Sequence, residues 1–274
     1  RSLELEGRKL TDALGPTLAC RKSLETLALR ETMVGDGTLN LLANRPALKV
    51  LDIRVGANLG DSGMAAIARM KSIRALRLVG CDLKDEQIGE TLDGLSGLVE
   101  LDLRSSRGFS GVALQKIQGV TTLRTLKLGG PQINNDLIEP VAAMIGLTSL
   151  SIEESDIDDD GLLALADLRL RTLVLSKSLF VSDKGLAILE RFTDLESLDL
   201  QDTGATLAAT SLLPQPEKIA SLNLSQTGVR DEDVGQLARF VNLKRLSIKS
   251  TGLSDAAVEG LSEMTSLEQL DLAE

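Results

Sequence analysis

Paired apolar residues, Leu-x-Leu or Leu-x-Ile, recur along the whole chain at intervals of 23 to 25 residues. A repeat of this length that continues from end to end is typical of a solenoid, in which copies of one structural unit stack on each other. The leading leucines of the pairs are Leu3, Leu27, Leu51, Leu76, Leu101, Leu126, Leu150, Leu173, Leu198, Leu222, Leu246 and Leu270.

Each repeat changes its hydrophobic period once. In the copy from Leu243 to Ser266, apolar and polar residues alternate up to Lys249, which predicts a short, half-buried strand. The apolar residues then follow helical spacing after Ser254 and Asp255, which stand where a helix N-cap belongs. The pattern therefore predicts a strand, a turn and a helix of two to three turns in every repeat. The strands must run parallel because a helix returns the chain each time.

This unit resembles the leucine-rich repeat family, specifically its α/β horseshoe members. The best-known motif of that family has Asn three residues after the second strand leucine, where its amide bonds the turn. Here that column reads Thr32, Gly56, Cys81, Ser106, Pro131, Ser155, Ser178, Thr203, Thr227 and Thr251. Thr and Ser hydroxyls can make similar turn bonds, and the column looks like a Thr-type variant that is frequent among bacterial repeat proteins.

The resemblance implies an α/β fold and a single domain over residues 1–274. We expect a right-handed solenoid of about twelve repeats, with a parallel sheet on the concave face and short helices on the convex face. Arg1 precedes a strand directly and Glu274 follows one, without the polar capping repeats that solenoids usually carry. We therefore expect incomplete terminal repeats, a fragment of a longer protein, or end-to-end self-association of two copies.

Composition narrows the classes of function. A formal net charge of −10 and a pI near 4.8 predict that neither nucleic acid nor an anionic membrane surface is a partner. No apolar run approaches the roughly 18 residues that span a bilayer. The chain has no His, and its two cysteines, Cys20 and Cys81, cannot form a zinc site, so we expect no cofactor. Unpaired cysteines favour a cytoplasmic location, with a secreted effector as the alternative.

Carboxylates gather in the segment from Glu153 to Asp160. Part of it matches the opening of an EF-hand loop, in which alternate carboxylates wrap one Ca²⁺ ion. An EF-hand requires a helix on both sides, whereas a strand precedes this segment, and the same residues also fit the repeat. We favour an acidic, solvated turn. The weaker alternative is a calcium site formed by Asp156, Asp158, Asp160 and Asp167.

Two further sets of residues favour structural roles. Carboxylates stand at the predicted helix starts, where they would accept backbone N–H bonds and complement the helix dipole. These are Asp36, Asp61, Asp85, Asp183, Asp231 and Asp255. The four phenylalanines also occupy positions off the outward face of the strands, and we predict structural roles for them. They are Phe109, Phe180, Phe192 and Phe240.

Strand side chains that point away from the core should line the concave surface. The column between the paired leucines places Asp52, Arg77, Asp102 and Lys127 side by side, and this ladder of alternating charge can neutralise itself.

The next column brings Arg30 beside Arg54, with Arg104 two strands further on. Like charges in lateral contact are mildly destabilising. We therefore interpret these arginines as residues that the scaffold does not need and that suit an acidic partner, although Glu31 and Asp52 are close enough to neutralise them.

These columns predict a basic N-terminal half of the concave face, an acidic bend and a polar C-terminal half. The predicted partner-binding residues are Arg30, Arg54, Arg77, Arg104, Lys127, Glu153 and Glu154. The sequence contains no Gly-rich phosphate loop, nucleophile–base pair or pocket-forming insertion, which argues against an enzyme. We predict a non-catalytic protein–protein interaction scaffold, as the resemblance also implies. The alternative is a recognition arm of a larger bacterial enzyme, effector or receptor.

Overall fold

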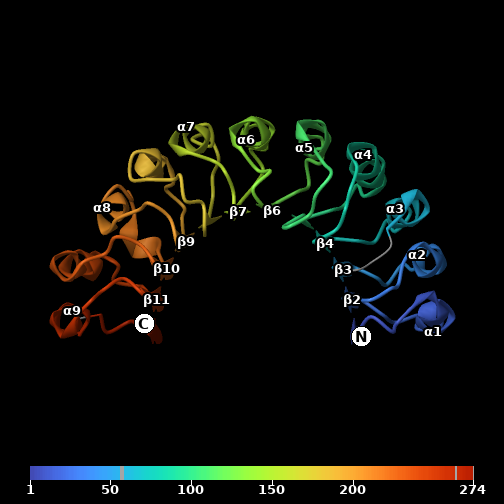
Figure 1. Cartoon of the computed structure of the whole chain (residues 1–274), viewed down its shortest axis with the longest axis horizontal. Helices are drawn as coiled ribbons and strands as arrows, with labels where there is room; N and C mark the ends of the chain where they lie inside the picture. The colour runs from blue at the N-terminus through green and yellow to red at the C-terminus, as the bar shows by residue number, and fades with distance from the viewer. Residues whose placement is uncertain (56–58, 263, 274) are drawn as a thin grey trace. The chain divides into compact units, whose positions relative to one another are not determined.

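The computed structural model describes residues 1–55, 59–262 and 264–273, and the chain divides into two compact units. Unit 1 is Arg1–Leu128 and unit 2 is Gly129–Glu274. Within each unit the chain runs from strand to turn to helix in every repeat, with the strands along one side and the helices along the other (Figure 1). The expected α/β repeat fold is thereby confirmed, whereas the extent of the domain stays a prediction. Gly56 of the turn column lies outside the described residues.

Unit 1 begins each repeat with a strand, and each strand pairs in parallel with the strand of the next repeat. The strands are β1 (Ser2–Glu6), β2 (Thr26–Arg30), β3 (Val50–Arg54), β4 (Ala75–Val79), β5 (Glu100–Asp102) and β6 (Thr125–Gly129), whose last residue opens unit 2. The helices are η1 (Asp12–Leu14), α1 (Gly15–Ala19), α2 (Asp36–Leu42), α3 (Asp61–Ala68), α4 (Asp85–Gly94) and α5 (Gly111–Gln118).

Unit 2 continues the same order with shorter strands, which also pair in parallel. The strands are β7 (Ser149–Glu153), β8 (Thr172–Val174), β9 (Ser197–Asp199), β10 (Ser221–Asn223), β11 (Arg245–Ser247) and β12 (Gln269–Asp271). The helices are α6 (Asn135–Ala142), α7 (Asp159–Leu163), η2 (Gly185–Arg191), α8 (Leu207–Thr210), η3 (Pro216–Lys218), η4 (Asp231–Arg239) and α9 (Asp255–Leu261). The helical segments η2 and η4, at positions where the pattern predicts a helix, are 3₁₀ helices.

The leading leucines hold the repeats in register. In unit 1 Leu27 pairs with Leu51, and in unit 2 Leu150 pairs with Leu173. All four side chains are fully buried. Burying a leucine side chain contributes about 1.5–3 kcal/mol, so this column is a large part of what holds each stack together.

Hydroxyls of the Thr and Ser column bond the turns in several repeats, whereas the buried Thr32 hydroxyl has no hydrogen-bond partner among the described residues. The Thr203 hydroxyl donates to the Leu200 carbonyl at 2.7 Å, within its own repeat, and Thr227 and Thr251 bond in the same way. The buried Ser106 hydroxyl instead donates to the carbonyl of Leu78 in the preceding repeat at 2.6 Å. Small hydroxyl residues therefore anchor the turns both within and between repeats.

The aspartate column accepts backbone N–H groups, but those groups belong to the next repeat. The Asp183 carboxylate accepts the N–H of Thr206 at 2.8 Å and its hydroxyl at 2.6 Å. The Thr206 hydroxyl in turn accepts the N–H of Ala208 and so caps α8. Asp85 and Asp231 bond Ser110 and Ser254 in the same way. The expectation that each aspartate caps its own helix is wrong in these repeats, because the neighbouring helix start lies within reach of the carboxylate.

A second column, which the pattern does not reveal, has left-handed backbone. Among the described residues, φ is positive at the residue four positions after the leading leucine, shortly after the strand. Glycine adopts this conformation freely, whereas other residues pay about 1–2 kcal/mol for it. The column is Gly7, Glu31, Val55, Gly80, Ser105, Gly130, Glu154, Lys177, Asp202, Gln226 and Ser250.

Asp12 stands nine positions after Leu3, as Asp36 does after Leu27, and so belongs to the aspartate column. Its contacts predict a pH-dependent loss of stability in Asp12→Asn. Asp12 accepts the N–H groups of Gly35, Gly37 and Thr38 in the next repeat at 2.9–3.1 Å. Burial opposes ionisation, but these bonds outweigh it and lower the pKa of Asp12. A lowered pKa gives stability that is present above the ordinary value of 3.8 and is lost as the pH falls through the folded value.

We therefore expect Asp12→Asn to lower the free energy of unfolding by about 1 kcal/mol at pH 7, and by much less at pH 3, in urea denaturation. The control is Glu86→Gln, because Glu86 lies in the first turn of α4 and makes no inter-repeat bond in the described structure. An equal loss for Asp12→Asn at both pH values would contradict this role of the carboxylate.

The left-handed column predicts that Val55→Asn stabilises the chain. Val55 has φ of 45° and is only half-buried, at 49 % exposed, so the change relieves strain and removes little buried apolar surface. Asparagine tolerates this backbone far better than a β-branched residue. We expect the free energy of unfolding to rise by about 1 kcal/mol. Gly80→Ala should lower it, because φ is 66° there and a Cβ atom would lie 2.9 Å from Val55 Cγ2. A neutral or destabilising Val55→Asn contradicts the strain.

Candidate interaction surface

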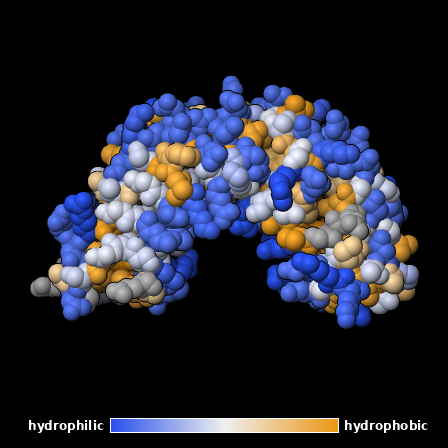
Figure 2. Space-filling view, viewed as in Figure 1, coloured by the Kyte–Doolittle hydropathy of each residue, from blue (hydrophilic) through white to orange (hydrophobic). Residues whose placement is uncertain are grey.

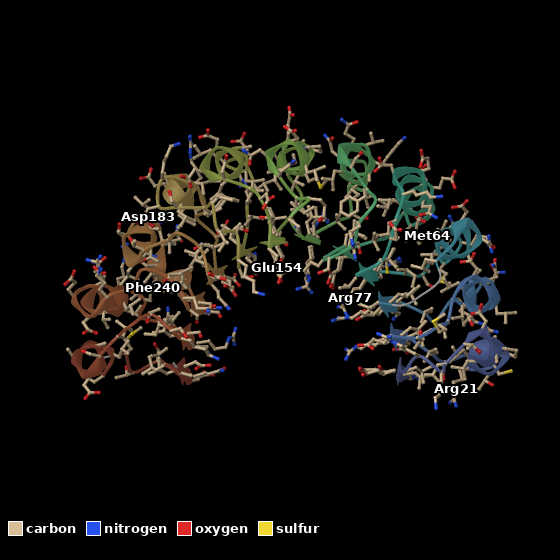
Figure 3. The ribbon with its side chains drawn as sticks, viewed as in Figure 1. Arg21, Met64, Arg77, Glu154, Asp183 and Phe240 are labelled. Carbon is tan, nitrogen blue, oxygen red and sulfur yellow. The ribbon has the colours of Figure 1, made fainter. Side chains whose placement is uncertain are left out.

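The strand face of unit 1, defined as the side chains of β1–β6 that point away from the helices, brings the predicted residues together. The sheet register places Arg30 beside Arg54, and Arg77 between Asp52 and Asp102. These lateral neighbours are the ones that the alternation predicts. Figure 3 shows Arg77 on this strand side of the molecule.

Asp52 and Arg54, two residues apart on β3, form a two-pronged ion pair. Arg54 Nε donates to Asp52 Oδ1 at 2.8 Å, and Arg54 Nη2 donates to Oδ2 at 2.9 Å. The Asp52 side chain is only 4 % exposed, whereas that of Arg54 is 35 % exposed. The hydrogen bond to Asp52 outweighs partial burial and raises the pKa of Arg54, so the guanidinium stays charged. Such paired bonds fix the plane of the guanidinium as well as its position.

Asp102 and Arg104 repeat this arrangement two strands further on. Arg104 Nε and Nη2 donate to the two carboxylate oxygens at 3.0 and 2.9 Å. The backbone N–H of Arg104 also donates to Asp102. Asp102 is completely buried. Removing Arg104 would therefore leave a buried charge without its cation, a loss that costs about 3–5 kcal/mol in proteins.

Glu100 joins Arg77 and Lys127 across three strands. Arg77 donates to the two oxygens of Glu100 at 2.8 and 3.1 Å, and Lys127 Nζ lies 3.5 Å from Glu100 Oε1. Arg77 also lies 3.7 Å from Asp52, which links this group to the pair on β3. The hydrogen bond from Arg77 outweighs burial and lowers the pKa of Glu100. The sequence did not single out Glu100. The sequence feature that could have identified Glu100 is its position directly before a leading leucine, in an outward-facing column.

These contacts correct the interpretation of the arginines. Arg54 and Arg104 are needed by the scaffold, because each one neutralises a buried carboxylate. The alternative that Asp52 neutralises its neighbour is the one that the structure supports. Arg30 differs from them: it pairs with Glu4, whose side chain is 53 % exposed, so no buried charge depends on it.

The charges of unit 1 form two layers over β3–β6. The side chains of Arg54, Arg77, Arg104 and Lys127 are 28–35 % exposed, whereas those of the carboxylates beneath them are 0–20 % exposed. We call these four cations the outer cation layer. Carboxylates and cations are equally numerous in the outward columns of the first six repeats, so the basic character belongs to this outer layer. The residues counted are Glu4, Glu6, Asp52, Glu100 and Asp102 against Arg30, Arg54, Arg77, Arg104 and Lys127.

The two units differ strongly in total charge. Unit 1 contains 19 Lys and Arg and 15 Asp and Glu, a formal charge of +4. Unit 2 contains 11 Lys and Arg and 25 Asp and Glu, a formal charge of −14. The two units therefore carry net charges of opposite sign.

Unit 2 holds the two predicted glutamates. Glu153 accepts the Ser151 hydroxyl at the end of β7. Glu154 lies in the left-handed column and pairs with Lys177 of the next repeat at 2.7 Å. Within unit 2, burial raises the pKa of Asp199, against the hydrogen bonds that this carboxylate accepts. Sequence reasoning did not single out Asp199, because nothing in its column reveals its burial.

The acidic segment of unit 2 acts as a set of turn contacts. Asp158 caps α7 by accepting the N–H groups of Asp160 and Gly161, and Asp160 lies 3.3 Å from Lys184. Asp167 lies beyond the end of α7. Among the described residues no cluster of three or more His, Cys, Asp or Glu has an arrangement that could hold a metal ion. The favoured interpretation, an acidic turn within the repeat, fits these contacts.

Comparisons with known proteins agree with this architecture. A family model described as Leucine Rich repeat matches residues 147–166. An internalin from Listeria monocytogenes is similar in structure, with a TM-score of 0.60 and 18 % identity over 94 % of this chain and 83 % of that chain. A chain of the yeast Rad7 and Elc1 complex has a TM-score of 0.66 and 18 % identity over 93 % of this chain and 71 % of that chain. The sequence matches no curated protein.

In the described part of the chain, no helix combines the length and apolar character needed to cross a membrane. The recurring strand, turn and helix, the buried leucine column and the matching family model agree with one another. The chain has a leucine-rich repeat fold, and the leucine-rich repeat family model matches one of its repeats.

Proposed function

We propose that this chain is a non-catalytic protein-interaction scaffold and that the strand face of unit 1 binds an acidic segment of a partner protein. The leucine-rich repeat fold supports an interaction role in general, and one structural neighbour comes from a complex of two proteins. The binding residues are those of the outer cation layer together with Arg30.

The observation that carries this proposal is the layering of charge. Each guanidinium of the pairs on β3 and β5 uses Nε and Nη2 for its buried carboxylate. The cation remains 28–35 % exposed above that carboxylate. Its position is thus set before a partner arrives, which lowers the entropy lost on binding. Arginine is also enriched among the residues that dominate protein–protein affinity.

The test must spare the buried ion pairs, because their loss would destabilise the fold and so obscure any effect on binding. Arg30 and Lys127 can be replaced without leaving a buried carboxylate unpaired. Glu4 is exposed, and Glu100 keeps its paired bonds to Arg77. The probe is a dye-labelled octapeptide of glutamate, with binding measured by fluorescence anisotropy at low and physiological salt.

We expect the double variant Arg30→Gln and Lys127→Gln to raise the Kd threefold to tenfold, which is about 0.7–1.4 kcal/mol, and salt to weaken binding to the native chain. The control is the double variant Arg21→Gln and Lys22→Gln, which removes the same two charges from exposed positions of unit 1 just beyond α1; Figure 3 shows Arg21 there. Equal affinity of the native chain and the first double variant, or an equal loss in the control, would refute the strand face as the binding surface.

A further inference from the structure

Leu179 and Phe180 form an exposed apolar pair in a turn of unit 2, and each side chain is 62 % exposed. In the repeat that starts at Leu222, a single residue separates Thr227 from the buried Val229. In the repeat that starts at Leu173, two residues, Leu179 and Phe180, lie in the equivalent interval between Ser178 and the buried Val181. The repeat thus contains one added residue, and its core is complete without the pair.

Phe180 is the exposed aromatic residue of the chain. The other three phenylalanines, Phe109, Phe192 and Phe240, are 6 %, 2 % and 1 % exposed, and the sequence contains no Trp or Tyr. The structural role predicted for Phe180 is therefore wrong, since the added residue moves the ring out of the core. Aromatic side chains, phenylalanine among them, are enriched in the buried cores of protein–protein interfaces.

Carboxylates of the preceding repeat border this apolar pair. The backbone of Phe180 forms a parallel bridge with that of Asp158. Asp156 and Leu179 both stand six positions after their leading leucines, and Asp156 is exposed. Figure 2 shows apolar surface among hydrophilic residues in the part of unit 2 between α7 and α8.

Two lysines of the next repeat lie near these carboxylates, but each pairs with another carboxylate, and the charge of Lys184 also lowers the pKa of Asp158. Lys177 pairs with Glu154 at 2.7 Å, and Lys184 pairs with Asp160 at 3.3 Å. The Asp158 carboxylate accepts one hydrogen bond from the Asn135 amide at 2.7 Å, which is the main cause of its lowered pKa. The N–H of Gly161 lowers this pKa further, so the carboxylate stays charged. The border of the apolar pair is therefore negative, within a unit of formal charge −14.

We propose that Leu179, Phe180, Asp156 and Asp158 form a second docking surface, which binds a segment of a partner protein carrying Arg or Lys beside apolar residues. Its apolar side chains cover Leu179 and Phe180, and its cations face the two carboxylates. This surface goes beyond the proposed function: it lies on the turns of unit 2, and it selects a partner segment of the opposite charge.

The probe for this surface is a dye-labelled octapeptide with four arginines and two leucines among glycines. Two matched peptides replace either its leucines by serine or its arginines by glutamate. We expect the native chain to bind the arginine–leucine peptide, and to bind each matched peptide at least fivefold more weakly. Equal binding of the peptide that lacks leucine would overturn the proposal, because charge alone would then explain the contact.

Variants locate the binding on the chain. We expect Phe180→Ser to weaken binding of the arginine–leucine peptide about tenfold, and Asp156→Asn about threefold. Both side chains are exposed, so the melting temperature should not change. The matched control is Ile145→Ser, since Ile145 is an apolar side chain of unit 2 that is 74 % exposed and lies just beyond α6. The native affinity in Phe180→Ser, or the same loss in Ile145→Ser, would refute this site.

Discussion

Burial of one leucine column in register is the constraint on which the rest of this structure depends. Because the leading leucines of successive strands pair with each other, every other strand position also acquires a lateral neighbour in the same column. Neighbouring strands lie about 4.8 Å apart, so residues of one column interact whatever their charge. The packing of the core thus determines which surface side chains become lateral neighbours. The residues at the remaining strand positions must be compatible with those neighbours.

Bonds between repeats are the result of this constraint. The Asp183 carboxylate bonds the start of the next helix, and the Ser106 hydroxyl reaches a carbonyl of the preceding repeat. On the strand face of unit 1, Arg30 and Arg54 lie side by side despite their like charges, because each forms an ion pair with a different carboxylate. The same ion pairs that make this face compatible with the fold also hold its cations in place for a partner.

Sequence periodicity was sufficient to predict the strands, the core residues and the lateral neighbours on the sheet, because all three follow from which side chains must be buried. It was insufficient where a contact depends on local geometry. The reach of Asp183 to Thr206 depends on how two helix starts lie beside each other. The left-handed column is occupied by residues as different as Val55 and Lys177, so no residue type marks it. The pairing of Arg54 with Asp52 on the same strand requires a side-chain conformation that alternation does not specify.

The central claim is that buried carboxylates hold the guanidinium groups of unit 1 in place before any partner binds. Nitrogen-15 relaxation of arginine Nε–H groups in the free chain measures this directly. Arg54 and Arg104 should show order parameters close to the rigid-backbone value of about 0.85, and Arg21 should fall below about 0.6. If Arg54 and Arg104 prove as mobile as Arg21, the cations are not held in place and the account is wrong.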